Sequence, residues 1–207
     1  MKRVSIILVL AATPAHADCT AEVRSLFEAG GPNDPFSRPP HRQVQITYGP
    51  DGTETFRAAN VIETPLRTIH GMAGQCTLAV DAKYWTGPCE AATWDGPGGA
   101  FPGDRAQGVR ARVAQEQANV SEAECFGPVD LNGRQVLKYR YRTQTAPAED
   151  GGFSGERATV WIDPETNRWV RWEAAEMVTP WQPEPDGSRV VTTFVYDESI
   201  AVTPPAE

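Results

Sequence analysis

Residues 157–174, RATVWIDPETNRWVRWEA, predict a β-hairpin near the end of the chain. Asp163 to Asn167 supply turn-forming residues, and β-branched and aromatic residues dominate the runs on either side. Two further strand-like runs flank this hairpin, residues 133–143 (GRQVLKYRYRT) and 189–202 (RVVTTFVYDESIAV). Because consecutive strands joined by short turns usually pair as antiparallel neighbours, the last third of the chain predicts a β-meander.

The tryptophans of the hairpin predict rings on both faces of this sheet. Side chains alternate along a strand, so Val160 and Ile162 share one face and Trp161 lies on the other. In the returning strand Trp169 and Trp172 are three residues apart, which places them on opposite faces. A sheet with indole rings on both sides is covered on both sides, or it lines a cavity on one side.

Basic residues form one face of the strand over residues 133–143. Lys138, Arg140 and Arg142 alternate there with the apolar positions Leu137, Tyr139 and Tyr141. The guanidinium groups could bind the anionic head group of a ligand, because arginine offers paired donors to carboxylate or phosphate. The alternative is a solvated sheet face whose bases pair with the many acidic residues of the chain.

The first two thirds of the chain predict two helices and several short strands. Apolar spacing predicts helices over residues 19–29 and 104–119, the second with Asp104 as its N-cap. Alternation predicts strands over 43–48, 53–64, 66–72 and 76–85. Residues 33–41 are a proline-rich connector, and residues 86–103, rich in Gly and Pro, predict a long loop.

The N-terminus predicts export. Met1-Lys2-Arg3, the apolar run 4–12 and the small residues Ala15 and Ala17 match a cleaved secretory signal over residues 1–17. The apolar run is shorter than the roughly 20 residues of a membrane-spanning helix. We therefore expect a periplasmic protein without a membrane span, with residues 18–207 as one domain. Lipid attachment at Cys19 is the alternative, disfavoured by Asp18 directly before it.

Four cysteines, Cys19, Cys76, Cys89 and Cys125, predict two disulfides in an oxidising compartment. Three pairings are possible. Cys76 and Cys89 flank a strand-like segment, which favours a local bridge closing a hairpin and leaves Cys19 to pair with Cys125. A zinc site is the rival interpretation, but the cysteine spacings do not match zinc motifs, so we expect no metal.

Five segments of the C-terminal third carry a resemblance to a known superfamily: residues 132–133, 136–141, 159–163, 168–171 and 196–204. Together they resemble the C-terminal half of the periplasmic lipoprotein carriers LolA, LolB and LppX. The resemblance implies a mainly β (α+β) fold, a half-open antiparallel β-barrel whose concave face is covered by helices. It also implies a lipid or acyl chain held in the concavity. The glycine-rich segment 86–103 and the four cysteines depart from this pattern.

Composition and motifs favour binding over catalysis. After removal of residues 1–17 the chain has 17 basic and 27 acidic residues, a net charge of −10 that disfavours nucleic acid. Neither a nucleophile motif nor a phosphate-binding glycine loop is present, so we expect a non-enzymatic protein without a cofactor. The alternative is a disulfide-stabilised module that contacts a protein of the cell envelope.

Aromatic residues could line the ligand pocket or simply pack the core; the candidates are Trp161, Trp169, Trp172, Tyr139, Tyr141 and Phe194.

Overall fold

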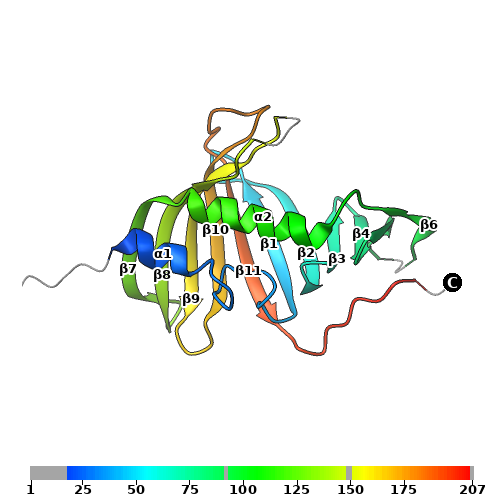
Figure 1. Ribbon diagram of the computed structural model, residues 1–207, viewed down its shortest axis with the longest axis horizontal. Coiled ribbons are helices and arrows are strands. Elements are labelled where there is room, and N and C mark those ends of the chain that lie inside the picture. Colours follow the sequence, from blue (N-terminus) through cyan, green and yellow to red (C-terminus); the bar gives the residue numbers. More distant parts are fainter. Residues whose placement is uncertain (1–17, 91–92, 148–150, 206–207) are drawn as a thin grey trace, which may run out of the picture.

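The computed structural model describes residues 18–90, 93–147 and 151–205. Within these residues the chain forms one 11-stranded antiparallel sheet and two helices that lie on the same face of it (Figure 1). The helices are α1 (Cys19–Ser25) and α2 (Arg105–Ala118). The strands are β1 (His41–Tyr48), β2 (Glu54–Thr64), β3 (Arg67–Met72), β4 (Gln75–Val80), β5 (Lys83–Pro88), β6 (Asp95–Ala100), β7 (Ser121–Leu131), β8 (Arg134–Gln144), β9 (Gly155–Asp163), β10 (Arg168–Val178) and β11 (Arg189–Tyr196).

The sheet consists of two meanders joined along one pair of strands. Strands β1 to β6 follow one another, as do β7 to β11, and β1 pairs with β11 in the middle. Their register sets His41 opposite Tyr196 and Gln43 opposite Phe194. The end strands β6 and β7 do not pair with each other, so the sheet is a half-open barrel. The predicted meander and the predicted fold class are confirmed.

The predicted strand over residues 76–85 and the predicted loop over 86–103 are wrong in detail. Residues 75–88 form two strands, β4 and β5, around a turn in which Asp81 has a positive φ of 54°. The glycine-rich segment then forms the edge strand β6. A Cβ atom on Gly98 would lie 2.5 Å from Trp85, and one on Gly99 would lie 2.4 Å from Tyr84. Glycine is therefore what lets the backbone of β6 lie against these two rings.

The prediction that Trp169 and Trp172 lie on opposite faces is also wrong. Trp169 pairs with Ile162 and Trp172 pairs with Val160, but the register shifts between Trp169 and Arg171. This β-bulge inserts one extra residue into β10, and an extra residue reverses the face of everything that follows it. Both indole rings consequently lie on the face of Val160 and Ile162, which we call the inner face because it carries the helices.

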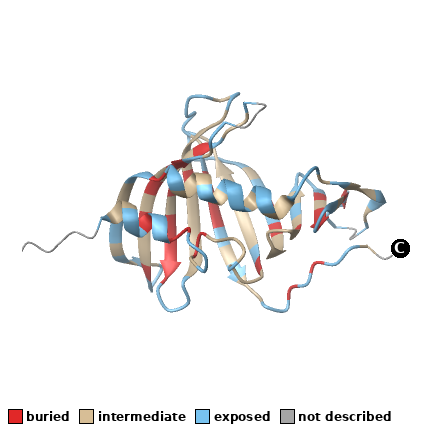
Figure 2. Ribbon diagram, in the orientation of Figure 1, coloured by how far each residue is buried: buried red, intermediate tan, exposed pale blue. Residues whose placement is uncertain are grey.

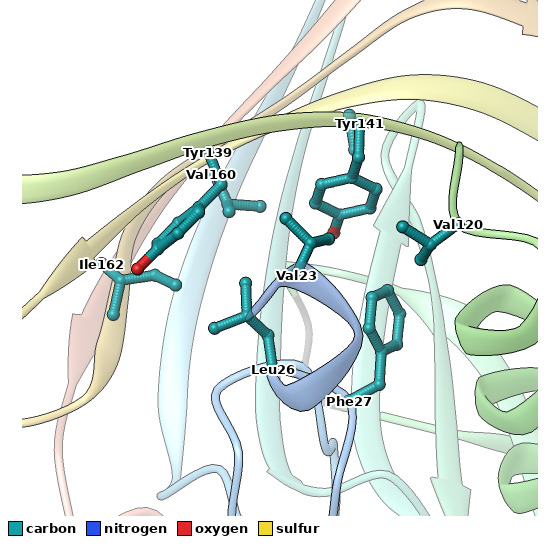
Figure 3. Close-up of a cluster of buried hydrophobic side chains, with 9 residues drawn as sticks. Val23, Leu26, Phe27, Val120, Tyr139, Tyr141, Val160 and Ile162 are labelled. Atoms are coloured by element: carbon teal, nitrogen blue, oxygen red, sulfur yellow. The ribbon is translucent and has the colours of Figure 1, made fainter. Parts of the chain in front are cut away.

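The main hydrophobic core lies between α1 and strands β8 and β9 (Figure 3). Val23 and Phe27 insert from the helical segment against Tyr139, Tyr141 and Val160. The helix is shorter than predicted and ends at Ser25, after which the chain continues in turns. A disulfide from Cys19 to Cys125 attaches the start of α1 to β7. This strand, residues 121–131, was not predicted from the sequence.

A smaller core lies on the outer face, where the C-terminal segment packs against the first meander. Ile200 and Val202 pack with Leu78, Val80 and Trp85. The predicted strand over residues 189–202 is therefore too long, since β11 ends at Tyr196. The second disulfide joins Cys76 to Cys89 at the open end of the β4–β5 hairpin. Both cysteine pairs are those expected from the sequence.

The predicted signal sequence, residues 1–17, lies outside the described residues. Among the residues that are described, neither helix has the length and apolar character needed to cross a membrane.

Candidate ligand-binding cavity

A cavity of about 340 Å³ lies on the inner face, between the sheet and α2. Its floor comes from β1, β8, β9, β10 and β11, and its other walls come from α2 and the connector before β1. Figure 1 shows α2 extending across this face in front of the strands. The volume falls near the lower end of the range usual for small-molecule sites, which is about 300–1,000 Å³.

Aromatic rings form the apolar part of the floor. Trp169 and Trp172 stack with ring centroids 6.5 Å apart, and the edge of Phe194 meets Trp169 at 5.5 Å. Phe194 in turn stacks on Tyr196 with ring centroids 6.5 Å apart. The bulge in β10 creates this wall, because without it one of the two indoles would lie on the outer face.

Helix α2 covers the cavity without filling it. None of its residues is buried: half of them are exposed and half are of intermediate exposure (Figure 2). Polar contacts hold it at both ends: Arg105 donates 2.9 Å from Nη1 to the Leu66 carbonyl, and the Thr143 hydroxyl donates 2.6 Å to the Glu116 carbonyl. Val113 of this helix lines the cavity. The helix is thus a polar cover over an aromatic floor.

Asn33 joins the connector to the floor through two hydrogen bonds. Its side-chain amide donates to the Tyr141 hydroxyl at 2.9 Å, and its carbonyl oxygen accepts from the Trp169 indole at 3.0 Å. Asn33 is only 5% exposed. Burial raises the pKa of Tyr141, so this hydroxyl stays protonated. These bonds fix the orientation of two floor rings.

Arg38 occupies one end of the cavity. Its guanidinium carbon lies 3.9 Å from the centroid of the Trp169 ring, a cation–π contact. One Nη donates to the Pro32 carbonyl at 3.1 Å, while the Nε is buried and has no hydrogen-bond partner among the described residues. Burial lowers the pKa of this guanidinium to about 10, so it remains charged near neutral pH.

Carboxylates occupy the other end. Glu156 lies on β9 and Glu116 on α2, and both line the cavity. Burial raises the pKa of Glu156 to about 7, with a smaller contribution from the negative charge of Glu116. Glu116 itself pairs with Arg112 at 2.8 Å. The cavity therefore has a buried guanidinium at the Trp169 end and, at the other end, a carboxyl of raised pKa beside an Arg112–Glu116 ion pair.

The structure brings four of the six predicted ligand-binding residues together. Tyr141, Trp169, Trp172 and Phe194 all line the cavity. Tyr139 lies beside it in the core under α1, where its hydroxyl donates to Glu22 at 2.8 Å.

Trp161 lies on the outer face instead, between the inward-facing Val160 and Ile162. It is 9% exposed, and the charged groups of Lys138 and Arg171 lie 5.4 and 5.3 Å from its ring. The sixth candidate therefore has no access to the cavity.

The basic residues of β8 are also on the outer face, and the arginines pair with acidic neighbours. Arg140 contacts Glu124 at 2.6 Å. Arg142 pairs with both Glu122 and Glu176. This is the paired, solvated arrangement, and it leaves the arginines engaged rather than open to an anionic head group.

Sequence reasoning missed Asn33, Arg38 and Glu156. The first two come from the irregular connector, where neither helical nor strand periodicity assigns a direction to a side chain. The alternation of residues in β1 could have predicted two further cavity residues. It places the polar side chains of Gln43 and Gln45 on the inner face, where they line the cavity. In the described residues no cluster of His, Cys, Asp and Glu is arranged to hold a metal ion.

Comparison with solved structures identifies the fold. No protein-family model matches the sequence, and no curated protein matches it significantly. The Mycobacterium tuberculosis lipoprotein LppX superposes with a TM-score of 0.50 at 14% identity, covering 90% of this chain and 100% of LppX. LprF from Mycobacterium bovis gives a TM-score of 0.53 at 12% identity, covering 90% of this chain and 98% of LprF. The chain therefore has the LolA/LppX-like fold that its C-terminal third resembles.

Proposed function

We propose that this protein is a non-enzymatic, periplasmic binding protein that holds a lipid or other ligand with an apolar chain in the cavity beneath α2. One observation carries the proposal: the aromatic floor of the sheet faces a helix that buries none of its own side chains. An apolar chain lying on Trp169, Trp172 and Phe194 would supply the missing cover. Each Å² of apolar surface removed from water would contribute about 25 cal/mol.

The size of the cavity favours a ligand with a single chain. A volume of about 340 Å³ lies near the lower end of the range for small-molecule sites, which agrees with one alkyl chain better than with several. Polar residues at its edge, including Gln43 and Gln45, would orient the ligand without adding much affinity.

Support for the periplasmic location comes from the N-terminal sequence pattern and from the two disulfides, which persist in oxidising compartments. A binding role also agrees with the setting of His41. Its ring packs between Phe194 and Tyr196, and burial lowers its pKa, as expected for a packing residue rather than a proton carrier.

Native mass spectrometry with added decanoate tests this proposal, and β11 offers a matched pair of variants. Thr192 lines the cavity and is buried, whereas the next residue, Thr193, is exposed on the outer face. Thr192→Phe should fill the cavity and abolish the one-to-one complex, while Thr193→Phe should leave it intact. Melting curves of both variants establish that they are folded. Equal binding by the two folded variants would contradict the proposal.

A further inference from the structure

We propose that the ligand carries an anionic head group, and that Arg38 binds this head at the Trp169 end of the cavity. This inference rests on the proposed function and adds the chemical class and the orientation of the ligand. The proposed ligand has a single alkyl chain that ends in a carboxylate or a phosphate. Both anions match the paired donors of a guanidinium group.

Arg38 is charged and has no anionic hydrogen-bond partner within the described residues. There its hydrogen bond goes to the Pro32 carbonyl, and its buried Nε has no acceptor among the same residues. A buried cation without a hydrogen-bonded counter-charge is costly, so such groups are normally paired in folded proteins. Here the unpaired donor belongs to a residue that lines the cavity.

The groups around Arg38 are already engaged. The Asp34 carboxylate accepts from the backbone amides of Gly30 and Phe36 rather than from the guanidinium. The Tyr196 hydroxyl donates to the Trp169 carbonyl at 3.0 Å. Asp34 therefore acts on Arg38 only as a nearby charge, and neither Asp34 nor Tyr196 forms a hydrogen bond with the guanidinium.

The face of Trp169 holds the guanidinium in place. A planar guanidinium stacked on an indole loses little further freedom when it binds an anion, so the stacking preorganises the site. The same ring continues the aromatic floor toward Trp172. A ligand could thus place its head against Arg38 and its chain on the two indoles.

The opposite end of the cavity disfavours the reverse orientation. Glu156 lies six residues before Ile162, the partner of Trp169, so the Cα atoms of Glu156 and Ile162 are about 20 Å apart along an extended strand. An anionic head at that end would meet the Glu156 carboxylate once it ionises, whereas Glu116 is already paired with Arg112. A cationic head would be favoured there and disfavoured beside Arg38.

Titration calorimetry with four ten-carbon ligands, decanoate, decyl phosphate, decanol and decylamine, tests the head-group site. The native protein should bind decanoate or decyl phosphate on the order of 10- to 100-fold more tightly than decanol, with decylamine weakest. Comparing the two anions distinguishes a carboxylate ligand from a phosphate ligand. Arg38→Met should lose this preference, so that decanoate and decyl phosphate bind it no more tightly than decanol does.

Two further variants control the result. Arg42→Met removes the same charge from an exposed position on the next strand, so it should keep the preference for anions. Arg38→Lys keeps the charge but loses the paired donors, and it should retain part of the preference, which tests the site even if Arg38→Met does not fold. Equal affinity of the native protein for decanol and decanoate, or tightest binding of decylamine, would overturn the head-group site while leaving the proposed function standing. Absence of binding by all four ligands would overturn both.

Discussion

Arg38 stacks over Trp169 with its guanidinium carbon 3.9 Å from the ring centroid, which brings the irregular connector into contact with the bulged strand β10. The connector thereby completes the cavity that the sheet and α2 leave open. Asn33, from the same connector, hydrogen-bonds both Trp169 and Tyr141. The geometry of the candidate site thus depends on a segment without regular secondary structure.

Asn33→Ala should lower the free energy of unfolding by about 2–4 kcal/mol, because it leaves the Trp169 indole and the Tyr141 hydroxyl without their buried partner. Tyr141→Phe should cost less, since it removes one of the two bonds. Urea denaturation of both variants and of the double variant gives a double-mutant cycle. A coupling of about 1 kcal/mol is expected, and strict additivity would contradict the bond between these side chains.

The Glu156 carboxyl should make stability depend on pH. Because its pKa is raised to about 7 in the fold, the folded protein keeps this proton at pH values where the unfolded chain has lost it. The contribution of the Glu156 proton to the free energy of unfolding is therefore fully present below the pKa that Glu156 has in the unfolded chain. This contribution is lost as the pH rises toward 7. Between pH 5 and pH 8 the native protein should lose roughly 2 kcal/mol relative to Glu156→Gln.

Denaturant titrations at the two pH values measure this difference. Glu28→Gln, at an exposed position, is the matched control and should follow the native protein at both pH values. A constant difference between the native protein and Glu156→Gln would show that Glu156 does not titrate in this range.

The two disulfides should contribute differently to stability and to binding. Replacing Cys19 and Cys125 by Ser releases a link across 106 residues and should cost about 5 kcal/mol, against about 3 kcal/mol for Cys76 and Cys89, which are 13 residues apart. The first link holds the start of α1, and the segment after α1 supplies Phe27 to the cavity.

Ligand binding should therefore weaken in the Cys19→Ser/Cys125→Ser protein and persist in the Cys76→Ser/Cys89→Ser protein. Decanoate titrations at a temperature where both proteins are folded measure the contrast. If binding instead persisted in the Cys19→Ser/Cys125→Ser protein and weakened in the Cys76→Ser/Cys89→Ser protein, the ligand would lie near the β4–β5 hairpin.

Replacing each of two glycines, Gly99 and Gly108, by alanine should change the stability of the protein in opposite directions. A Cβ on Gly99 would lie 2.4 Å from the Tyr84 ring, so Gly99→Ala should destabilise the protein by about 1–3 kcal/mol. Gly108 lies inside α2 with nothing within 4 Å of the added atom, so Gly108→Ala should stabilise it by up to about 1 kcal/mol. Thermal melts of the two variants test both signs, and a neutral Gly99→Ala would contradict the close packing of β6 on β5.

Much of the fold was predictable because its elements are locally regular. The helix predicted over residues 104–119 forms over Arg105–Ala118 with Asp104 accepting from the Gln107 amide as the N-cap. The apolar alternation of β8 placed Tyr139 and Tyr141 on the inner face. The hairpin and the order of the last strands followed from turn residues between β-rich runs.

The errors lie where the chain departs from regular geometry. Strand β7 has register shifts near Glu122 and Gly127, both with positive φ, and these shifts broke the alternation by which it could have been found. The bulge in β10 cannot be read from residue type, because its neighbours Val170 and Arg171 are ordinary strand residues. Strand β6 has a loop-like composition and depends on its packing against Trp85 and Tyr84. Tertiary contacts determined each of these features.

Fluorescence quenching by a brominated acyl chain, 11-bromoundecanoate, tests most directly whether a chain lies on the Trp169 and Trp172 rings. Bromine quenches an indole only at close contact, so titration should quench the native protein and Trp161→Phe to a similar extent, because Trp161 is on the outer face. In Trp169→Phe/Trp172→Phe, still folded and still binding decanoate in calorimetry, most of the quenching should disappear. Quenching that survives the double variant but is lost in Trp161→Phe would contradict an apolar ligand in this cavity.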